Sequence, residues 1–106
     1  MGKRRIPLKT DTGPIDSLLG KPVEGETDLH GLDARSAEIK LESFLPRWAK
    51  TKPGAVVRVI TGRGNRSDSG PVLKPLVRDL LDGRLARHVQ RYTLETGGGA
   101  YLVQVR

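Results

Sequence analysis

The sequence predicts an α/β fold in which a mixed four-stranded sheet is covered by two helices, in the order βαβαββ. Two segments carry apolar residues at helical spacing, and a β-branched run, Ala55–Ile60, lies between them. The C-terminal residues indicate two strands joined by the glycines 97–99. A strand–helix–strand unit makes its strands parallel, and a final hairpin adds antiparallel pairing. At 106 residues the chain has room for one such domain.

Residues 1–24 are predicted to form a flexible basic N-terminal extension, and residues 25–106 the folded domain. The extension carries prolines and glycines at short intervals and has no sustained hydrophobic period. Its one apolar island, Ile15–Leu19, is expected either to dock on the domain as a short turn or to bind a partner.

The first strand is expected at Asp28–His30, followed by a helix that Asp33 caps at its N-terminus. Pro46 lies inside this helix, and because proline cannot donate the helical hydrogen bond, the helix is expected to kink or end near Leu45. The helix is predicted from one apolar stripe: Ala34, Ala37, Leu41, Phe44, Leu45 and Trp48. Its two aromatic residues, Phe44 and Trp48, are interpreted as part of the core rather than as platforms for base stacking.

Ala55–Ile60 is predicted as a mostly buried strand, and the polar residues 61–69 as a loop. Pro71 suits the first turn of a second helix, and Gly83 is predicted to end it. The last strands are expected at about 88–95 and 100–105. The second helix has its own apolar stripe: Val72, Leu73, Leu76, Val77, Leu80 and Leu81.

The charge balance points to a polyanionic partner. Nineteen lysines and arginines against 12 acidic residues give a net charge of +7 and a pI near 10.3. Nucleic acid fits this charge first, although ribosomal or membrane surfaces also carry the required sign. The absence of cysteine excludes disulfides and thiolate metal sites. No signal peptide or membrane-spanning run of ~20 apolar residues is found, so a cytoplasmic protein without a membrane partner is expected.

Asp28 and His30 form the first candidate site. Residues two apart on a strand point to the same face, so the carboxylate and the imidazole are expected side by side at the strand end. Gly31 then lets the chain turn toward the helix. An imidazole can exchange a proton near neutrality, which suits acid–base chemistry next to a bound anion. In a generic domain, the same pair would simply form hydrogen bonds at the end of a strand.

The second candidate is the loop that follows the buried strand. Its glycines allow close backbone approach, its N–H groups can cradle a phosphate, and its arginines can bind one in a bidentate fashion. If the first two strands are parallel, His30 and Gly62 meet at the carboxyl edge of the sheet, where ligands gather. A dinucleotide site is disfavoured, because the glycines fall in the wrong βα unit. The candidate phosphate-binding residues of this loop are Thr61, Gly62, Arg63, Gly64, Asn65 and Arg66.

The third candidate is the glycine turn, with Gly97 and Gly98 as possible phosphate ligands. On the residues alone, a hairpin loop that tolerates positive φ is the favoured interpretation of these glycines. Tyr101, and less so Tyr92, are candidates for stacking a base from the sheet. Three further arginines are interpreted either as a basic strip along a phosphate backbone or as a solvated face: Arg84, Arg87 and Arg91.

Taken together, the three motifs resemble the signatures of the Small MutS-related (Smr) domain family. They are Asp28-Leu29-His30-Gly31, Thr61-Gly62-Arg63-Gly64 and the segment 97–103, in the family's order, and the resemblance spans about residues 26–106. It implies a two-layer α/β sandwich, nucleic-acid binding and, in several members, cleavage of nucleic acid. Thr61 stands where some members have histidine, so a second imidazole is missing. Some Smr domains bind without cutting.

The function expected from this pattern is endonuclease or nickase cleavage of phosphodiester bonds in RNA or structured DNA. Asp28 and His30 are the expected catalytic residues, and Arg63 the expected stabiliser of phosphate charge. A 2′-hydroxyl makes a metal-free route available on RNA, so no cofactor is expected, although a divalent metal is conceivable on DNA. The alternative is a non-catalytic module that binds nucleic acid or the ribosome. The oligomeric state stays open.

Overall fold

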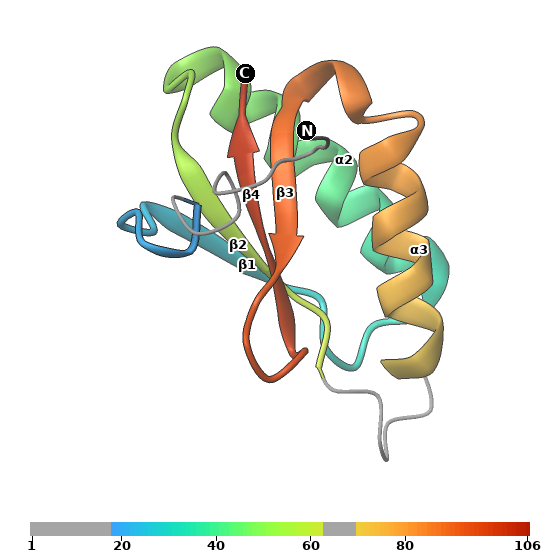
Figure 1. Ribbon diagram of the computed structural model, residues 1–106. Helices are drawn as coiled ribbons and strands as arrows, with labels where there is room; N and C mark the ends of the chain where they lie inside the picture. Colours follow the sequence, from blue (N-terminus) through green and yellow to red (C-terminus); the bar gives the residue numbers. More distant parts are fainter. Residues whose placement is uncertain (1–17, 63–69) are drawn as a thin grey trace, which may run out of the picture.

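The computed structural model describes residues 18–62 and 70–106. The helices are α2 (Ala34–Thr51) and α3 (Gly70–Asp82), with a 3-10 turn η1 (Ala86–His88) after the second. The strands are β1 (Gly25–Asp28), β2 (Val56–Ile60), β3 (Val89–Leu94) and β4 (Ala100–Val105), which form one sheet in the order β1-β2-β4-β3 (Figure 1). The predicted α/β fold with βαβαββ order is confirmed.

The sheet is mixed, as predicted. β1 runs parallel to β2, with Thr27 opposite Val59, and β4 runs antiparallel to both β2 and β3. Because β1 and β2 are parallel, their carboxyl ends lie at the same edge of the sheet. The β3–β4 hairpin turns at this edge as well (Figure 1). Segments that are about 30 and 65 residues apart along the chain therefore meet at one end of the molecule.

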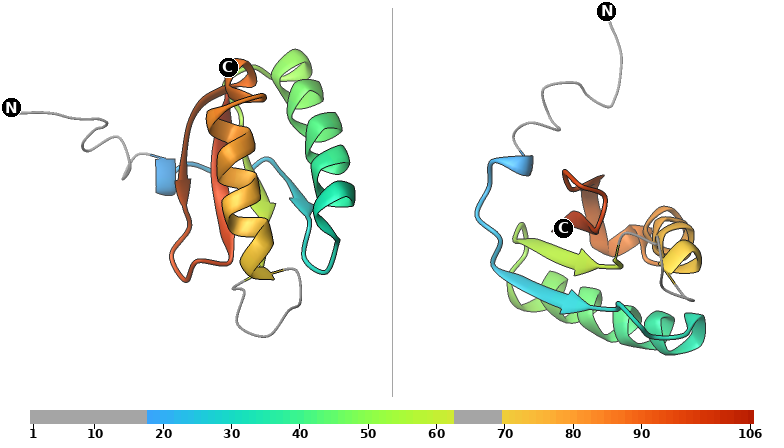
Figure 2. Two further views of the ribbon diagram at one scale, coloured as in Figure 1. Left: turned by 90° about the vertical axis from the view of Figure 1, so that its right-hand side faces the viewer. Right: turned by 90° about the horizontal axis from the view of Figure 1, so that it is seen from below.

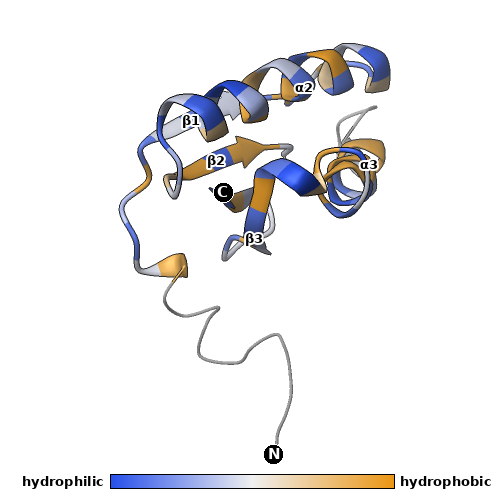
Figure 3. Cartoon of the chain, turned by 90° about the horizontal axis from the view of Figure 1, so that it is seen from above, coloured by the Kyte–Doolittle hydropathy of each residue, from blue (hydrophilic) through white to orange (hydrophobic). Residues whose placement is uncertain are grey.

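Both helices cover the same face of the sheet, which makes the fold a two-layer sandwich (Figure 2). Side chains alternate along a strand, so Val57 and Val59 of β2 share a face with Val103 and Tyr101, their partners on β4. These four residues join the apolar stripes of α2 and α3 in one buried cluster. Figure 3 shows the corresponding alternation of hydrophobic and hydrophilic residues along the helices.

The opposite face carries a second, smaller apolar cluster. Leu18, only 1% exposed, packs there against Val56 and Leu102, with Val23 beside it. Within the segment predicted as a flexible extension, residues 18–24 are therefore part of the folded structure. The prediction that the apolar island docks is confirmed at Leu18; residues 1–17 lie outside the described residues.

Helix α2 begins as predicted and continues further than predicted. Asp33 is the N-cap, and its Oδ1 accepts the Ser36 N–H at 2.9 Å. The expected end near Leu45 is wrong, because the helix runs through Pro46 to Thr51. The last turn is held by burial of part of Trp48 against the core and by the Lys52 N–H, which donates to the Trp48 carbonyl at 2.8 Å. This tertiary packing outweighs the one helical bond that proline removes.

The bounds of two strands, β1 and β3, differ from the prediction. The first strand is Gly25–Asp28 rather than Asp28–His30, because the His30 N–H bonds to a side chain instead of a neighbouring strand. His88 lies in η1, so β3 begins at Val89 and ends before Glu95. The first residue of β1 has to be glycine, because a Cβ added to Gly25 would lie 2.2 Å from Cζ2 of Trp48.

Candidate active site

All three sequence motifs reach the same edge of the sheet. Asp28 is the last residue of β1, and Thr61 and Gly62 directly follow β2. The N–H groups of Thr61 and Gly62 both donate to the carbonyl of Gly99, each at 3.0 Å. One glycine carbonyl in the hairpin loop therefore fastens the end of β2 to the turn between β3 and β4.

Asp28 shapes the turn that carries His30. Its Oδ1 accepts the backbone N–H of His30 at 2.9 Å. Gly31 follows with a φ of 83°, a left-handed conformation that favours glycine, and the Leu32 N–H closes the turn on the Leu29 carbonyl at 3.0 Å. The predicted proximity of Asp28 and His30 is present, but the carboxylate bonds to the backbone of His30 rather than to its ring.

The imidazole of His30 lies against the backbone of Gly62. A Cβ added to Gly62 would be 2.9 Å from Cδ2 of His30, and Gly62 has a φ of 84°. Glycine is thus required here both by backbone conformation and by the approach of the ring. His30 is exposed, and none of the described residues forms a hydrogen bond with its ring nitrogens.

Thr61 has a supporting position. Its side chain is fully buried, and its hydroxyl donates to the Gly62 carbonyl at 3.1 Å. The amide of Gly62, predicted from the sequence to bind phosphate, already donates to Gly99. Thr61 and Gly62 therefore hold the loop in place for His30 rather than offering free N–H groups to a ligand.

The glycine turn is a hairpin loop that lies beside the candidate site. Gly97 and Gly98 have φ values of 96° and 76°, and the Gly98 N–H donates to the Glu95 carbonyl at 2.8 Å. The turn is therefore a hairpin loop that depends on positive φ. It also borders the candidate site through Gly99. Four predicted ligands lie outside the described residues: Arg63, Gly64, Asn65 and Arg66.

Two lysines at this edge were missed by sequence reasoning. Lys40 of α2 donates from Nζ to the Asp28 carbonyl at 3.1 Å. Lys74 of α3 brings its Nζ to 3.3 Å from the position of a Cβ on Gly98. Nothing in the sequence distinguishes these two from the other members of a set of 19 lysines and arginines. Only the packing of the helices over the sheet brings them to the motifs.

An ion-pair network lies on the uncovered face near the same edge. The guanidinium of Arg58 binds Glu95 through two bonds, Nε to Oε1 at 3.0 Å and Nη2 to Oε2 at 2.9 Å, and also reaches Glu26 at 3.3 Å. The hydrogen bond to Glu95 is the largest cause of the raised pKa of Arg58. Glu95 precedes the glycine turn, so this network links the turn to β1 and β2.

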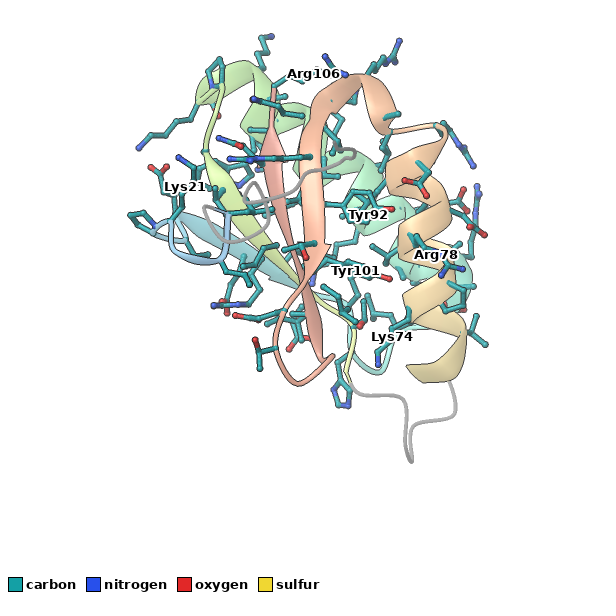
Figure 4. The ribbon with its side chains drawn as sticks, viewed as in Figure 1. Lys21, Lys74, Arg78, Tyr92, Tyr101 and Arg106 are labelled. Carbon is teal, nitrogen blue, oxygen red and sulfur yellow. The ribbon has the colours of Figure 1, made fainter. Side chains whose placement is uncertain are left out.

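The tyrosines do not form a stacking platform. Tyr101 is only 6% exposed and donates to the Lys74 carbonyl at 3.1 Å, and Tyr92 donates to Asp82 at 2.6 Å. Both point from the sheet toward α3 (Figure 4), and burial raises the pKa of each phenol. The prediction that they stack bases is wrong, because they occupy the face that the helices cover.

The arginines proposed as a basic strip also have other partners. Arg84 pairs with Glu38 and with Glu42 of α2, and Arg91 donates to the Gln104 side chain at 2.8 Å. These contacts fix Arg84 between the helices and Arg91 on the uncovered sheet face. Arg87, the third of these arginines, donates from Nε to Nε2 of His88 at 3.3 Å.

Within residues 18–62 and 70–106, no group of three or more histidine, aspartate or glutamate side chains is arranged to hold a metal ion. In the same part of the chain, no helix is long and apolar enough to cross a membrane.

Comparison with protein families gives one match: residues 27–106 match the Smr domain. A search of curated proteins gave no match. The matched region begins in β1 and includes all three motifs at the sheet edge.

Proposed function

The chain belongs to the Smr domain family, a nucleic-acid-binding and nuclease-related module, and we propose that it is an endonuclease in which His30 transfers a proton. The preferred substrate is RNA or a flexible single-stranded region. The observation that carries the proposal is the exposed His30 ring, held against Gly62 at the carboxyl edge of the sheet.

The proposed reaction on RNA is an internal transesterification. The imidazole of His30 takes the proton of a 2′-hydroxyl as the 2′-oxygen bonds to the adjacent phosphorus. The bond from phosphorus to the 5′-oxygen breaks, and the leaving oxygen takes a proton from the imidazolium or from water. The products are a 2′,3′-cyclic phosphate and a 5′-hydroxyl. The substrate supplies the nucleophile, so the route has no step that needs a metal.

Asp28 contributes by fixing the turn. Its carboxylate accepts the His30 N–H, and this bond supports a constant position of the imidazole relative to Gly62. Precise placement of a proton-transfer group lowers the entropic cost of reaching the transition state. Asp28 is therefore proposed as a positioning residue. Arg63 remains the proposed stabiliser of the phosphate charge, on the basis of the sequence motif.

A non-catalytic binding module is the second candidate. This candidate is supported by Thr61, which stands where some family members have a histidine and whose side chain is fully buried. His30 then has no second imidazole from this motif position to return the proton. Binding that depends on Asp28 and His30 without turnover is what this candidate predicts.

The decisive test is cleavage of end-labelled RNA and DNA of matched sequence, with and without EDTA, by wild type and His30→Ala. The proposal expects RNA cleavage in EDTA that is lost in His30→Ala while binding survives. His88→Ala is the matched control, because His88 lies in η1 rather than at the candidate site. Equal cleavage of DNA lacking the 2′-hydroxyl would overturn the mechanism, and binding without any cleavage would select the second candidate.

A further inference from the structure

Lys40 and Lys74 come from the two helices to the edge of the sheet that carries His30. Lys40 comes from α2 and donates to the carbonyl of Asp28, so its ammonium lies beside the turn that carries His30. An ammonium group has three donors, and this bond uses one of them. Lys40 is exposed, which leaves the group accessible to a ligand.

Lys74 approaches the same edge from α3. Its Nζ lies over the hairpin loop, 3.3 Å from where a Cβ on Gly98 would be. The hydroxyl of the buried Tyr101 donates to the backbone carbonyl of Lys74 at 3.1 Å. This anchor fixes the helical turn from which the lysine side chain extends toward the loop (Figure 4).

The strand order defines the path between the two lysines. Lys40 contacts the end of β1, Gly62 follows β2, and Lys74 contacts the hairpin that begins β4. Adjacent strands are about 4.8 Å apart, so the path from β1 to β4 covers roughly 10 Å. The exposed imidazole of His30, packed on Gly62, lies along this path.

Among the described residues at the end of β2, the backbone amides already have partners. The amides of Thr61 and Gly62 are bonded to Gly99, so they are not available to neutralise a phosphate. The neighbouring carboxylates are also engaged: Asp28 accepts the His30 N–H, and Glu95 is paired with Arg58. These bonds limit the repulsion that an approaching phosphate would meet from the two acids.

We propose that Lys40 and Lys74 bind backbone phosphates on opposite sides of His30, so that a single nucleic-acid strand crosses the end of the sheet from α2 to α3. This inference rests on the proposed function and specifies its substrate. The substrate is an oligonucleotide with phosphates flanking the bond to be cut, since only a polymer presents anions on both sides of the imidazole. A dinucleotide lacks these flanking charges.

The test measures binding separately from cleavage. The full chain carrying His30→Ala is titrated with a labelled 20-nucleotide single-stranded RNA over a series of NaCl concentrations. Each lysine that neutralises one phosphate contributes about 0.7 to the slope of log K against log salt. We expect Lys40→Gln and Lys74→Gln each to lower the slope by about this amount, and the double variant by about twice as much.

Lys50→Gln is the matched control, because Lys50 is an exposed lysine in the last turn of the same helix as Lys40. It removes the same charge and is expected to leave the slope unchanged. Lys40→Arg and Lys74→Arg should keep the wild-type slope. The inference is overturned if neither glutamine variant changes the slope, or if Lys50→Gln changes it equally, which would indicate a diffuse effect of net charge.

Cleavage by chains that retain His30 separates this inference from the proposed function. In cleavage of the 20-nucleotide RNA, Lys40→Gln and Lys74→Gln should raise KM and leave kcat close to wild type. In cleavage of a dinucleotide they should change neither constant. His30-dependent cleavage with unaltered salt slopes would retain the nuclease proposal and refute the lysine inference. Lowered salt slopes without any cleavage would retain the lysine inference and refute the nuclease proposal.

Discussion

The imidazole of His30 lies so close to the backbone of Gly62 that a single added methyl group would be 2.9 Å from its Cδ2 atom. The contact joins the end of β1 to the end of β2, two segments that are about 30 residues apart in the chain. It also sets the side of the ring that carries Cδ2 against the backbone of Gly62. This geometry makes Gly62 the most informative position for testing the site.

Under the nuclease proposal, Gly62→Ala should reduce cleavage more than it destabilises the fold. Alanine in the left-handed region costs about 1–2 kcal/mol in stability. Displacement of the His30 ring should in addition lower kcat by about 100-fold, the effect of moving a reacting group by ~1 Å. Urea unfolding and RNA cleavage measure the two effects.

Gly54→Ala is the control for this variant. Gly54 has a φ of 88°, and a Cβ there would meet nothing within 4 Å. The two variants should therefore share the backbone cost, while Gly54→Ala keeps wild-type kcat. Equal losses of activity would show that the Gly62–His30 contact has no catalytic importance.

Asp28→Asn should be far less damaging than Asp28→Ala. The amide oxygen of asparagine can still accept the His30 N–H, and asparagine supports this type of turn well. Loss of the acceptor in Asp28→Ala should lower kcat by about 10-fold, matching the ~1.5 kcal/mol of one hydrogen bond to a charged group. Single-turnover cleavage is the measurement. An asparagine variant as inactive as the alanine variant would mean that the charge itself takes part in the chemistry.

Arg58 should couple more strongly to Glu95 than to Glu26. Two hydrogen bonds join it to Glu95, whose side chain is 29% exposed, whereas a single 3.3 Å contact reaches Glu26, which is 54% exposed. Double-mutant cycles with Arg58→Gln should give about 0.5–1 kcal/mol for Glu95→Gln and about 0.2 kcal/mol for Glu26→Gln. Urea denaturation provides these values. Equal couplings would contradict the bidentate arrangement.

Asp33→Asn should reduce the decrease in folding stability that accompanies acidification. The hydrogen bonds with Ser36, first that of its side chain and then that of its backbone, lower the pKa of Asp33. A group with a lowered folded-state pKa binds more protons when unfolded, so its stabilisation is present above about pH 3.9 and is lost as the pH falls through the folded value. Asparagine caps helices comparably and does not titrate.

The measurement for this prediction is Tm between pH 2 and pH 6 for wild type and Asp33→Asn. Wild type should lose more Tm than the variant below pH 4, and the two curves should run parallel above it. Parallel curves over the whole range would show that the cap carboxylate does not contribute to acid sensitivity. Because Asp33 is fully exposed, salt should not be varied between the two proteins.

The sequence predicted the order of the elements and most of their bounds. Val56–Ile60 and Ala100–Val105 agree closely with the predicted strands, and Asp33 caps the first helix as expected. These features depend on neighbouring residues: side-chain periodicity, capping and turn chemistry act over a few positions. The prediction erred at Pro46, because burial of Trp48 and neighbouring residues keeps the helix intact beyond a local break.

The motifs themselves were also evident from the sequence, and parallel pairing of the first two strands placed His30 and Gly62 at one edge. The contacts that the motif residues make were not evident from the sequence. The sequence placed Tyr101 among candidates for base stacking, whereas the strand register turns it toward α3. It assigned the Gly62 amide to a phosphate, whereas the hairpin carbonyl of Gly99 takes that bond.

The sequence by itself determined the fold class, the element order and the three motifs, since each is encoded by residues close together in the chain. Only the tertiary structure decided that Asp28 binds the backbone of His30, that the ring rests on Gly62, and that Lys40 and Lys74 reach this edge of the sheet. These relationships depend on strand register and on how two helices lie across a sheet. Both are set by the packing of the whole core, which no local pattern contains.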